Sequence, residues 1–339
     1  MFESTFWLAP LLAALLTWSL TPLVRRYLVA RQIIDHPNHR SSHHQATPRG
    51  GGLAMAAGLV LAAIAVPADQ VAVVLVVILS LTVLGWLDDR HDLPVTVRLF
   101  AQFLLALGML AWLGGVTALS IAGVIITLPW LWSGLALIAV VWLINLHNFM
   151  DGSDGLAAMQ GAWSGLAFGM LFAHAEHRSE ALVAFSLAAV CLAFLFWNRP
   201  PARLFMGDVG SVLLGGMIAW LALVGVVVGA ISVWLSLMVC AVFVIDASMT
   251  LLARVRRGER WYTAHRQHAY QRLINAGWSH GRVLVMYTGV NVVVVLPALV
   301  IGVVYPGWDF WLALAVSGVL VAGWWAIQSA ANGELETHD

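Results

Sequence analysis

The sequence predicts an all-α integral membrane protein with about 11 transmembrane helices, forming a single polytopic domain over residues 1–339. Of the 339 residues, 61% are hydrophobic and only 10% are charged, whereas a soluble domain carries roughly a quarter charged residues. A membrane-spanning helix requires an apolar stretch of about 17–25 residues. Eleven apolar stretches follow one another along the chain, at about 6–24, 51–66, 70–87, 98–115, 131–147, 157–174, 181–197, 211–229, 232–251, 283–304 and 308–328.

The basic residues predict the orientation of these helices. All 17 are arginines, and they fall almost entirely on alternate connectors, since one set of connectors carries only Arg178. The other 16 lie on or beside the second set, which comprises 25–50, 88–97, 148–156, 198–210, 252–282 and the tail after 328. Arginine and lysine near transmembrane helices accumulate on the cytoplasmic side. We therefore expect the amino terminus outside, the carboxyl terminus in the cytoplasm, and a cytoplasmic basic loop or helix at 252–282.

Other features of the composition exclude some classes of protein. The formal net charge is zero, which gives no general attraction to nucleic acid. Cys191 and Cys240 both fall inside apolar stretches, so they indicate neither a disulfide nor a metal site. The first apolar stretch is preceded by too little positive charge for a signal peptide and has no small-residue cleavage site, so we interpret it as a retained helix. The β-branched stretch 118–129 is too short to span and predicts an extracytoplasmic hairpin or re-entrant segment.

The first polar cluster lies at the end of the third apolar stretch, where Asp88 and Asp89 are followed by Arg90 and Arg98. Two adjacent carboxylates at a membrane boundary are costly unless positive charge compensates them. A solvated helix end is the simpler interpretation of this pair. The nearby arginines favour a pair of acids that acts beside a phosphate.

A second cluster follows the fifth stretch and contains Asn145, Asn148, Asp151 and Asp154, with glycines after both aspartates. Asparagine and aspartate oxygens are the ligands that hard cations prefer, and glycine lets the backbone approach a ligand closely. An ordinary turn would not need this concentration of oxygen ligands. The cluster predicts a cation site.

Two further clusters belong to the same predicted face. Asp208 opens the eighth stretch and can bind a cation, while Phe205 just before it offers a flat surface for a nucleotide base; a helix cap is the alternative role for the aspartate. Arg40 and Arg49 in the first cytoplasmic loop are candidate phosphate contacts. Together the clusters indicate Mg²⁺-assisted phosphoryl chemistry between a soluble diphosphate and a lipid-borne acceptor.

The order of these motifs resembles the polyprenyl-phosphate N-acetylhexosamine-1-phosphate transferases (glycosyltransferase family 4), a bacterial family that includes enterobacterial-antigen and O-antigen initiating transferases and muramyl-pentapeptide translocase. The resemblance covers about residues 30–282. It rests on P-R-G-G-G at 48–52, G-W-L-D-D at 85–89, N-L-H-N-F-M-D-G-S-D-G-L at 145–156, F-M-G-D-V-G-S at 205–211, and the basic loop with His268.

The resemblance implies catalytic and metal-binding roles. Asp208 would bind Mg²⁺, which Mn²⁺ can replace, with Asn148 close to it. Asp88 and Asp89 would bind or deprotonate the lipid phosphate, and Asp151 would belong to the same polar floor.

The resemblance also implies the substrates and the residues that bind them. The donor would be a UDP-N-acetylhexosamine (UDP-HexNAc), the acceptor undecaprenyl phosphate, the product UMP, and the location the bacterial inner membrane, with no nucleic acid involved and a homodimer left open. The implied substrate-binding residues are Arg49, Arg98, Asp154, Phe205, His268 and Arg272.

The basic loop departs from the family pattern. Many relatives have H-x-H-H where this chain has His268-Ala-Tyr270-Gln271. This form resembles the subgroup that starts O-antigen with a 6-deoxy-N-acetylhexosamine such as the N-acetylfucosamine or N-acetylquinovosamine form. A UDP-GlcNAc-specific initiating transferase is the alternative.

Two other classes fit a polar membrane protein. A CDP-alcohol phosphatidyltransferase would need Ala-Arg shortly after Asp-Gly and two further spaced aspartates, but Gly155 is followed by Leu-Ala-Ala-Met. A transporter places charges near the bilayer midplane, whereas here only Asp246 lies inside an apolar stretch. The role of Asp246 stays open between a buried, paired carboxylate and a neighbour of the lipid phosphate.

Overall fold

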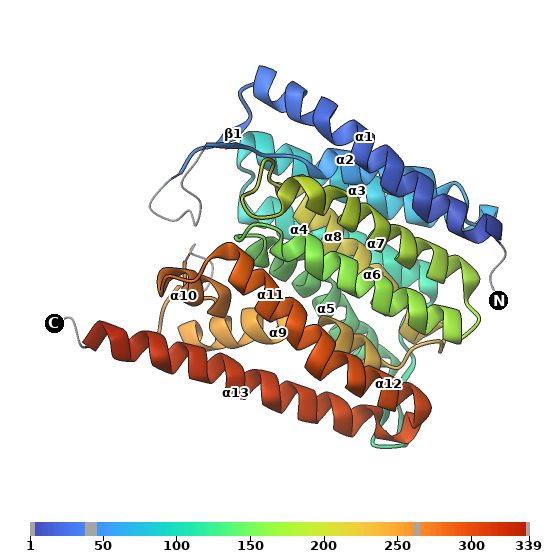
Figure 1. Ribbon diagram of the computed structural model, residues 1–339. Coiled ribbons are helices and arrows are strands. Elements are labelled where there is room, and N and C mark those ends of the chain that lie inside the picture. Colours follow the sequence, from blue (N-terminus) through green and yellow to red (C-terminus); the bar gives the residue numbers. More distant parts are fainter. Residues whose placement is uncertain (1–3, 38–45, 261–264, 337–339) are drawn as a thin grey trace.

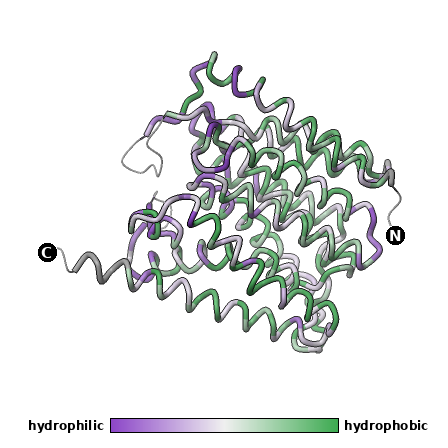
Figure 2. The backbone as a smooth tube through the Cα atoms, viewed as in Figure 1, coloured by the Kyte–Doolittle hydropathy of each residue, from purple (hydrophilic) through white to green (hydrophobic). Residues whose placement is uncertain are grey.

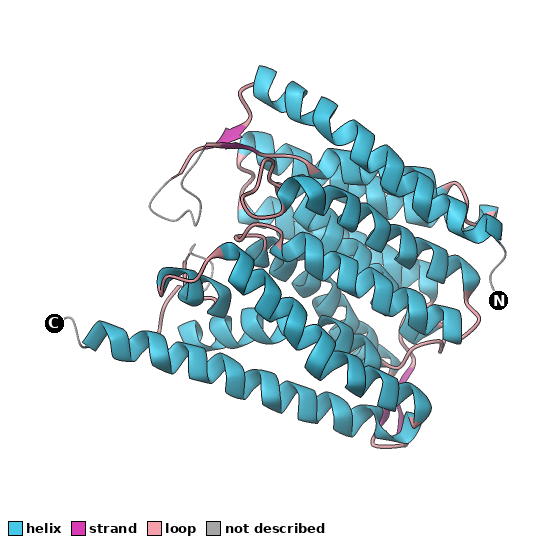
Figure 3. Ribbon diagram, in the orientation of Figure 1, coloured by secondary structure: helices cyan, strands magenta, loops and turns pink. Residues whose placement is uncertain are grey.

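The computed structural model is a bundle of long helices, and it describes residues 4–37, 46–260 and 265–336. Figure 1 shows the helices running roughly along one common direction. Among the described residues the strands form two short pairs, which lie near opposite ends of the bundle (Figure 3). The candidate phosphate contact Arg40 lies outside the described residues. The all-α membrane fold expected from the sequence is confirmed.

The elements in chain order begin with the 3-10 turn η1 (Ser4–Trp7) and continue to the long carboxyl-terminal helix. The first half contains α1 (Leu8–Ala30), β1 (Ile34–Asp35), β2 (Thr47–Pro48), α2 (Gly52–Ala63), α3 (Ala68–His91), α4 (Val95–Leu113), β3 (Ala118–Ile121), β4 (Val124–Thr127) and α5 (Pro129–Met150). The second half contains α6 (Leu156–His174), α7 (Arg178–Asn198), α8 (Asp208–Val227), α9 (Val233–Arg256), α10 (Ala269–Asn275), α11 (His280–Val290), the π-helical segment η2 (Asn291–Val295), α12 (Leu296–Val304), η3 (Pro306–Trp308) and α13 (Asp309–Glu336).

Ten helices of the described chain are long and apolar enough to cross a membrane, with α11, η2 and α12 together forming one of them. The remaining predicted stretch, 51–66, is helical but shorter, because α2 has 12 residues, or about 18 Å at 1.5 Å per residue. The start of α1 and the end of α13 nevertheless lie at opposite ends of the bundle (Figure 1). That arrangement requires an odd number of passes, so α2 and its connector to α3 complete a pass.

Helix α8 is the centre of the bundle. It packs against α3 and α5 on two sides, and most of its side chains are buried, from Val209 to Gly225. The outer helices instead expose large apolar side chains such as Trp18, Phe100 and Val293. Inside a bilayer these apolar side chains would face lipid. The helices can lie there because each helix satisfies its own backbone hydrogen bonds.

The short strands confirm one prediction for 118–129. β3 and β4 pair antiparallel from Ala118 with Thr127 to Ile121 with Val124, and they form a hairpin rather than a span. Trp234 at the start of α9 donates from its indole to the Ser120 carbonyl at 2.6 Å, which fixes the hairpin to the bundle.

Hydrophilic residues concentrate at the end of the bundle that carries β1 and α10, whereas the helices between the two ends are mostly hydrophobic (Figure 2). The four polar clusters of the sequence meet at that end. The fold therefore brings together motifs that are far apart in the chain.

The orientation of this end remains a prediction from the arginines. A reporter fused after the carboxyl terminus should be active in the cytoplasm, and one inserted in the 175–180 connector should face outward, because basic connectors stay on the cytoplasmic side. Reporter activity or cysteine labelling in intact cells measures this. An outward carboxyl terminus would reverse the assignment.

Candidate functional site

The amino terminus of α8 is held by a carboxylate from α3. Asp89 accepts hydrogen bonds from the backbone N–H groups of Asp208 and Val209, each at 2.9 Å. Gly207 precedes the helix with φ of 72°, a conformation that glycine adopts readily. The Asp89 side chain is completely buried, and its negative charge lies at the positive end of the helix dipole.

Arg49 joins the two aspartates at this helix end. Its Nε lies 2.6 Å from Asp89 Oδ1, and its terminal nitrogen lies 2.7 Å from Asp208 Oδ1. Burial disfavours the guanidinium charge, but the charges of Asp208 and Asp89 outweigh that effect and raise the pKa of Arg49 above its usual range. Arg49 therefore stays charged, and a third of its side chain is exposed toward the site.

Backbone contacts hold the two loops that carry Arg49 and Phe205. Phe205 N–H donates to Pro48 at 2.9 Å, and Gly51 N–H donates back to Phe205 at 2.9 Å. Helix α3 packs directly against the start of α8, because a Cβ on Gly85 would collide with the backbone of Asp208 and Val209. The glycines of these motifs thus allow direct contact between backbones.

Asn148, at the end of α5, reaches the same carboxylate. Its Nδ2 donates to Asp208 Oδ1 at 3.0 Å and to Ser211 Oγ at 3.2 Å. In this orientation the Oδ1 atom of Asn148 is the one left for a cation. The predicted pair of Asn148 and Asp208 is therefore brought into contact.

Asp88 forms a second ion pair beside the first. Its Oδ2 lies 2.7 Å from Arg98 of α4, and its Oδ1 accepts from Leu93 N–H at 2.9 Å. The carboxylate of Asp208 lies near enough to Asp88 to interact with it electrostatically. Arg49 and Arg98, both predicted to bind substrate, are thus already neutralised in part by aspartates.

Asp151 and Asp154 complete the acidic site in different ways. Burial, followed by the charge of Asp208, raises the pKa of Asp151 well above its usual range. Asp154 instead ties loops together, since its Oδ2 accepts from Ala202 N–H at 2.9 Å and its own N–H donates to Nδ1 of His280 at 3.0 Å. Asp154 therefore links the α5–α6 connector to the α7–α8 connector at Ala202 and to the start of α11 at His280.

Carboxylates outnumber cations in this cluster. Asp88, Asp89, Asp151 and Asp208 surround it, and Arg49 and Arg98 supply two positive charges. Like charges at such separations are unfavourable unless a cation compensates them. Among the described residues no group of three His, Cys, Asp or Glu side chains forms a complete metal-binding set. Mg²⁺ is usually held by one or two protein oxygens together with substrate phosphates, which the pair of Asp208 and Asn148 fits.

A cavity of about 540 Å³ opens beside the acidic cluster, between α4, α5, α9 and α10. One part of its wall is polar, with Arg98, Asn145, Asn148, His265, His268 and Gln271. The rest is apolar, with Val95, Leu99, Phe103, Ile138, Val141, Trp142, Phe149, Ala247 and Leu251. Burial, followed by the charge of His268, lowers the pKa of His265 to about 4, so this ring is neutral at pH 7. The cavity therefore suits a molecule with a charged head and an apolar tail.

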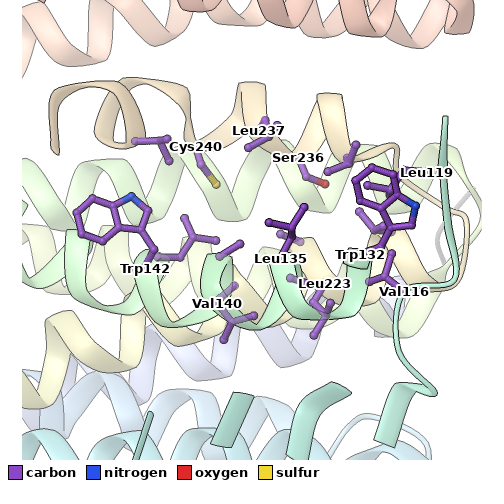
Figure 4. Close-up of a pocket in the computed structure, with 18 residues that line it drawn as sticks. Val116, Leu119, Trp132, Leu135, Val140, Trp142, Leu223, Ser236, Leu237 and Cys240 are labelled. Atoms are coloured by element: carbon purple, nitrogen blue, oxygen red, sulfur yellow. The ribbon is translucent and has the colours of Figure 1, made fainter. Parts of the chain in front are cut away.

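A second cavity of about 280 Å³ lies deeper along α5, between α8, α9 and the β3–β4 hairpin. Its lining is almost wholly apolar, and Figure 4 shows Trp142 and Trp132 at its two ends. Trp142 lines both cavities, and its indole donates to Ser248 Oγ at 3.0 Å. This side chain is the wall between them.

The described part of the basic loop contributes some of its residues to the first cavity and buries others. His268 precedes α10 and lines the first cavity together with Gln271. Tyr270 is completely buried, and its hydroxyl donates to the Phe149 carbonyl at 3.0 Å. Of the two residues that replace family histidines, only Gln271 therefore reaches the cavity. Arg272 is half-buried on α10.

Sequence reasoning missed two residues that shape the site. Gln102 accepts from Asn145 Nδ2 at 2.6 Å and fixes this amide at the cavity wall. An amide within the apolar sequence of α4 that follows Arg98 was the available signal. Gly85 belongs to the G-W-L-D-D motif, but its role depends on a contact with α8 that the sequence does not show.

Acidic side chains at one end of a helix bundle, next to a half-apolar cavity, define a membrane transferase that acts on phosphorylated substrates. Residues 71–226 match the family described as glycosyl transferase family 4. The phospho-N-acetylmuramoyl-pentapeptide-transferase of Synechococcus sp. (strain JA-3-3Ab) is 36% identical over 90% of this chain and 91% of its own.

Two other relatives agree with this match. The decaprenyl-phosphate N-acetylglucosaminephosphotransferase of Mycolicibacterium smegmatis is 34% identical over 84% of this chain and 80% of its own. The undecaprenyl-phosphate alpha-N-acetylglucosaminyl 1-phosphate transferase of Yersinia pestis is 26% identical, over 78% and 76%. The chain belongs to glycosyl transferase family 4, and this membership excludes the alternatives of a CDP-alcohol phosphatidyltransferase and a transporter.

The close approach of α3 to α8 generates a prediction. Gly85→Ala should lower the stability by about 1–3 kcal/mol, as overpacking does, and should reduce turnover because the end of α8 must shift. Gly108→Ala in α4 is the matched control, since nothing lies within 4 Å of the added Cβ, and helix propensity favours alanine by up to about 1 kcal/mol. Thermal unfolding in detergent compares the two variants. Equal effects would contradict the role of the contact.

Proposed function

We propose that the protein transfers an N-acetylhexosamine-1-phosphate from a UDP-linked donor to undecaprenyl phosphate and releases UMP, as the first membrane step of O-antigen or a related cell-surface polysaccharide. The observation that carries the proposal is the acidic cluster with its two arginines beside a cavity that is polar at one side and apolar at the other. In this reaction an oxygen of the lipid phosphate attacks the β-phosphorus of the donor. The bond from that phosphorus to the bridging oxygen breaks, and UMP leaves with the oxygen.

The first cavity suits the lipid acceptor. Its apolar wall of Leu99, Phe103 and Ile138 can take the isoprenoid units next to the phosphate, and Arg98 is near enough to contact the phosphate itself. Asp88 is ion-paired with Arg98, so a bound phosphate competes for the same guanidinium. Asp88 would then be released to accept a proton from the lipid phosphate.

The donor would bind on the other side of the acidic cluster. Phe205 is half-buried and is held by the loop that carries Arg49, so its ring can stack on uracil while Arg49 contacts the diphosphate. Asp154 and Arg272 would contribute to the nucleotide and sugar side, and His268 would contact a substrate from the wall of the first cavity. Both carboxylate oxygens of Asp89 already accept from the start of α8, and one of them also pairs with Arg49. We assign Asp89 the role of holding Arg49 in place.

Asp208 and Asn148 would hold Mg²⁺, with Mn²⁺ able to replace it. The bound cation would neutralise charge on the diphosphate of the donor. Asp151 sits in the same polar floor, where burial, followed by the charge of Asp208, raises its pKa, and the carboxylates of the cluster outnumber its arginines. This excess supports a cation at the site.

The metal assignment predicts the effect of a single substitution. Asp208→Asn should lose about 2–4 kcal/mol of transition-state stabilisation, the range measured when one electrostatic stabiliser is removed. Turnover of the unaltered protein should disappear with EDTA and return with Mg²⁺ or Mn²⁺. Asp309→Asn, at the far end of the bundle, is the matched control and should behave like the unaltered protein. Near-normal metal-dependent turnover in Asp208→Asn would refute the assignment.

The identity of the sugar is tested with a panel of donors. The His268-Ala-Tyr270-Gln271 loop supports a UDP-6-deoxy-HexNAc, whereas the names of the Mycolicibacterium and Yersinia relatives support UDP-GlcNAc. A pocket built around a methyl group rejects an added hydroxyl by only about a hundredfold at most. We expect the 6-deoxy donors to be best, with weaker use of UDP-GlcNAc, measured as UMP release by purified protein with undecaprenyl phosphate. UDP-GlcNAc as the best donor by about tenfold would favour the GlcNAc-specific alternative, and no UDP-sugar use would reject the proposed reaction.

A further inference from the structure

Asp246 is a buried carboxylate within α9, and the reaction proposed above gives it no role. Its oxygens accept hydrogen bonds from Tyr287 Oη at 2.6 Å, from Ala269 N–H at 2.8 Å and from Thr250 Oγ1 at 3.3 Å, and more weakly from Tyr270 N–H at 3.5 Å. The Trp324 indole of α13 donates to Thr250 Oγ1 at 3.1 Å. One carboxylate therefore collects contacts from α9, α10 and α11, and through Thr250 from α13.

The two backbone donors are the first two residues of α10. This helix has only seven residues, and isolated helices of that length are not stable in water. Its position must therefore come from tertiary contacts. Asp246 binds the end of α10 that is adjacent to the first cavity, where His268 and Gln271 form part of the wall.

The position of α10 also determines the position of the α5–α6 loop. Tyr270 extends from α10, and its hydroxyl donates to the Phe149 carbonyl at 3.0 Å. A Cβ on Gly152 would collide with that hydroxyl, so the ring and the loop fit closely. Burial, followed by the charge of Asp246, raises the pKa of Tyr270, and the hydroxyl remains a donor. Asn148 and Asp151 flank Phe149 in the sequence, so the contact between Tyr270 and Phe149 holds the segment that carries both.

We propose that Asp246 is a positioning residue: it anchors α10, and thereby sets the place of His268 and Gln271 at the cavity and, through Tyr270, of the loop that carries Asn148 and Asp151. It acts without touching either substrate. The importance of this position for turnover rests on the proposed function, whereas the anchoring itself does not.

The first test measures the anchoring by amide hydrogen exchange of the full-length protein in detergent. Asp246→Ala should speed exchange at least about tenfold in residues 268–275 and 149–153, because fewer contacts hold these segments. Asp246→Asn keeps an acceptor oxygen and should lie closer to the unaltered protein. Asp309→Ala, which removes a carboxylate at the opposite end, should leave both segments unchanged.

The outcomes of this test are distinct. Unchanged exchange in both segments of Asp246→Ala overturns the anchoring, whatever reaction the protein catalyses. If Asp246→Ala unfolds, Tyr270→Phe decides, since it removes one hydroxyl and should speed exchange in 149–153 alone. Unchanged exchange there would overturn the link between α10 and the loop.

The second test is kinetic. Asp246→Ala should raise the KM for the UDP-sugar at least about tenfold with a smaller change in kcat, and Asp246→Asn should restore most of the loss. A purely structural role would reduce the active fraction and leave the KM unchanged, and that result would overturn the positioning role. If the unaltered protein uses no UDP-sugar, the proposed function fails and the exchange result still stands.

Discussion

The site depends on one buried carboxylate at a helix end. Asp89 of α3 caps α8 with two backbone hydrogen bonds and holds Arg49 at 2.6 Å. Removing a partner from a buried pair leaves an uncompensated charge, which costs far more than the pair itself contributes. Arg49, Asp208 and Asn148 are arranged around this contact, so the geometry of the acidic cluster follows from how α3 meets α8.

Asp246 repeats this arrangement on the other side of the cavity. Asp89 lies near the end of α3 and Asp246 in the interior of α9, but each accepts from the first backbone N–H groups of a later helix. The first fixes the acidic cluster and the second fixes the basic loop. The starts of α8 and α10 are thus each held by a carboxylate. These contacts give the polar residues near the first cavity a defined position within an otherwise apolar bundle.

Much of the architecture could be predicted from the sequence, because hydropathy and arginine placement are local signals. The apolar stretches are helical, the segment 118–129 is a hairpin, and the motifs around Asp88, Asn148 and Asp208 meet at one end. The shortness of α2, the pairing of Arg98 with Asp88 and the burial of Tyr270 could not be predicted. Each depends on which distant residue becomes the neighbour, and composition and spacing carry no information on that choice. The carboxylate of Asp246 was visible as an anomaly, but its partners Ala269 and Tyr287 were not.

The glycine contacts around α8 have a consequence for how the protein can vary. Where Gly85 meets Asp208 and Gly52 meets Gly210, backbone lies against backbone with no side chain between. No substitution can adjust such a contact by small steps, since even a methyl group has no room. Helices that face lipid have no such restriction. The outer surface can therefore adapt to bilayers of different composition while the spacing of the carboxylates stays fixed.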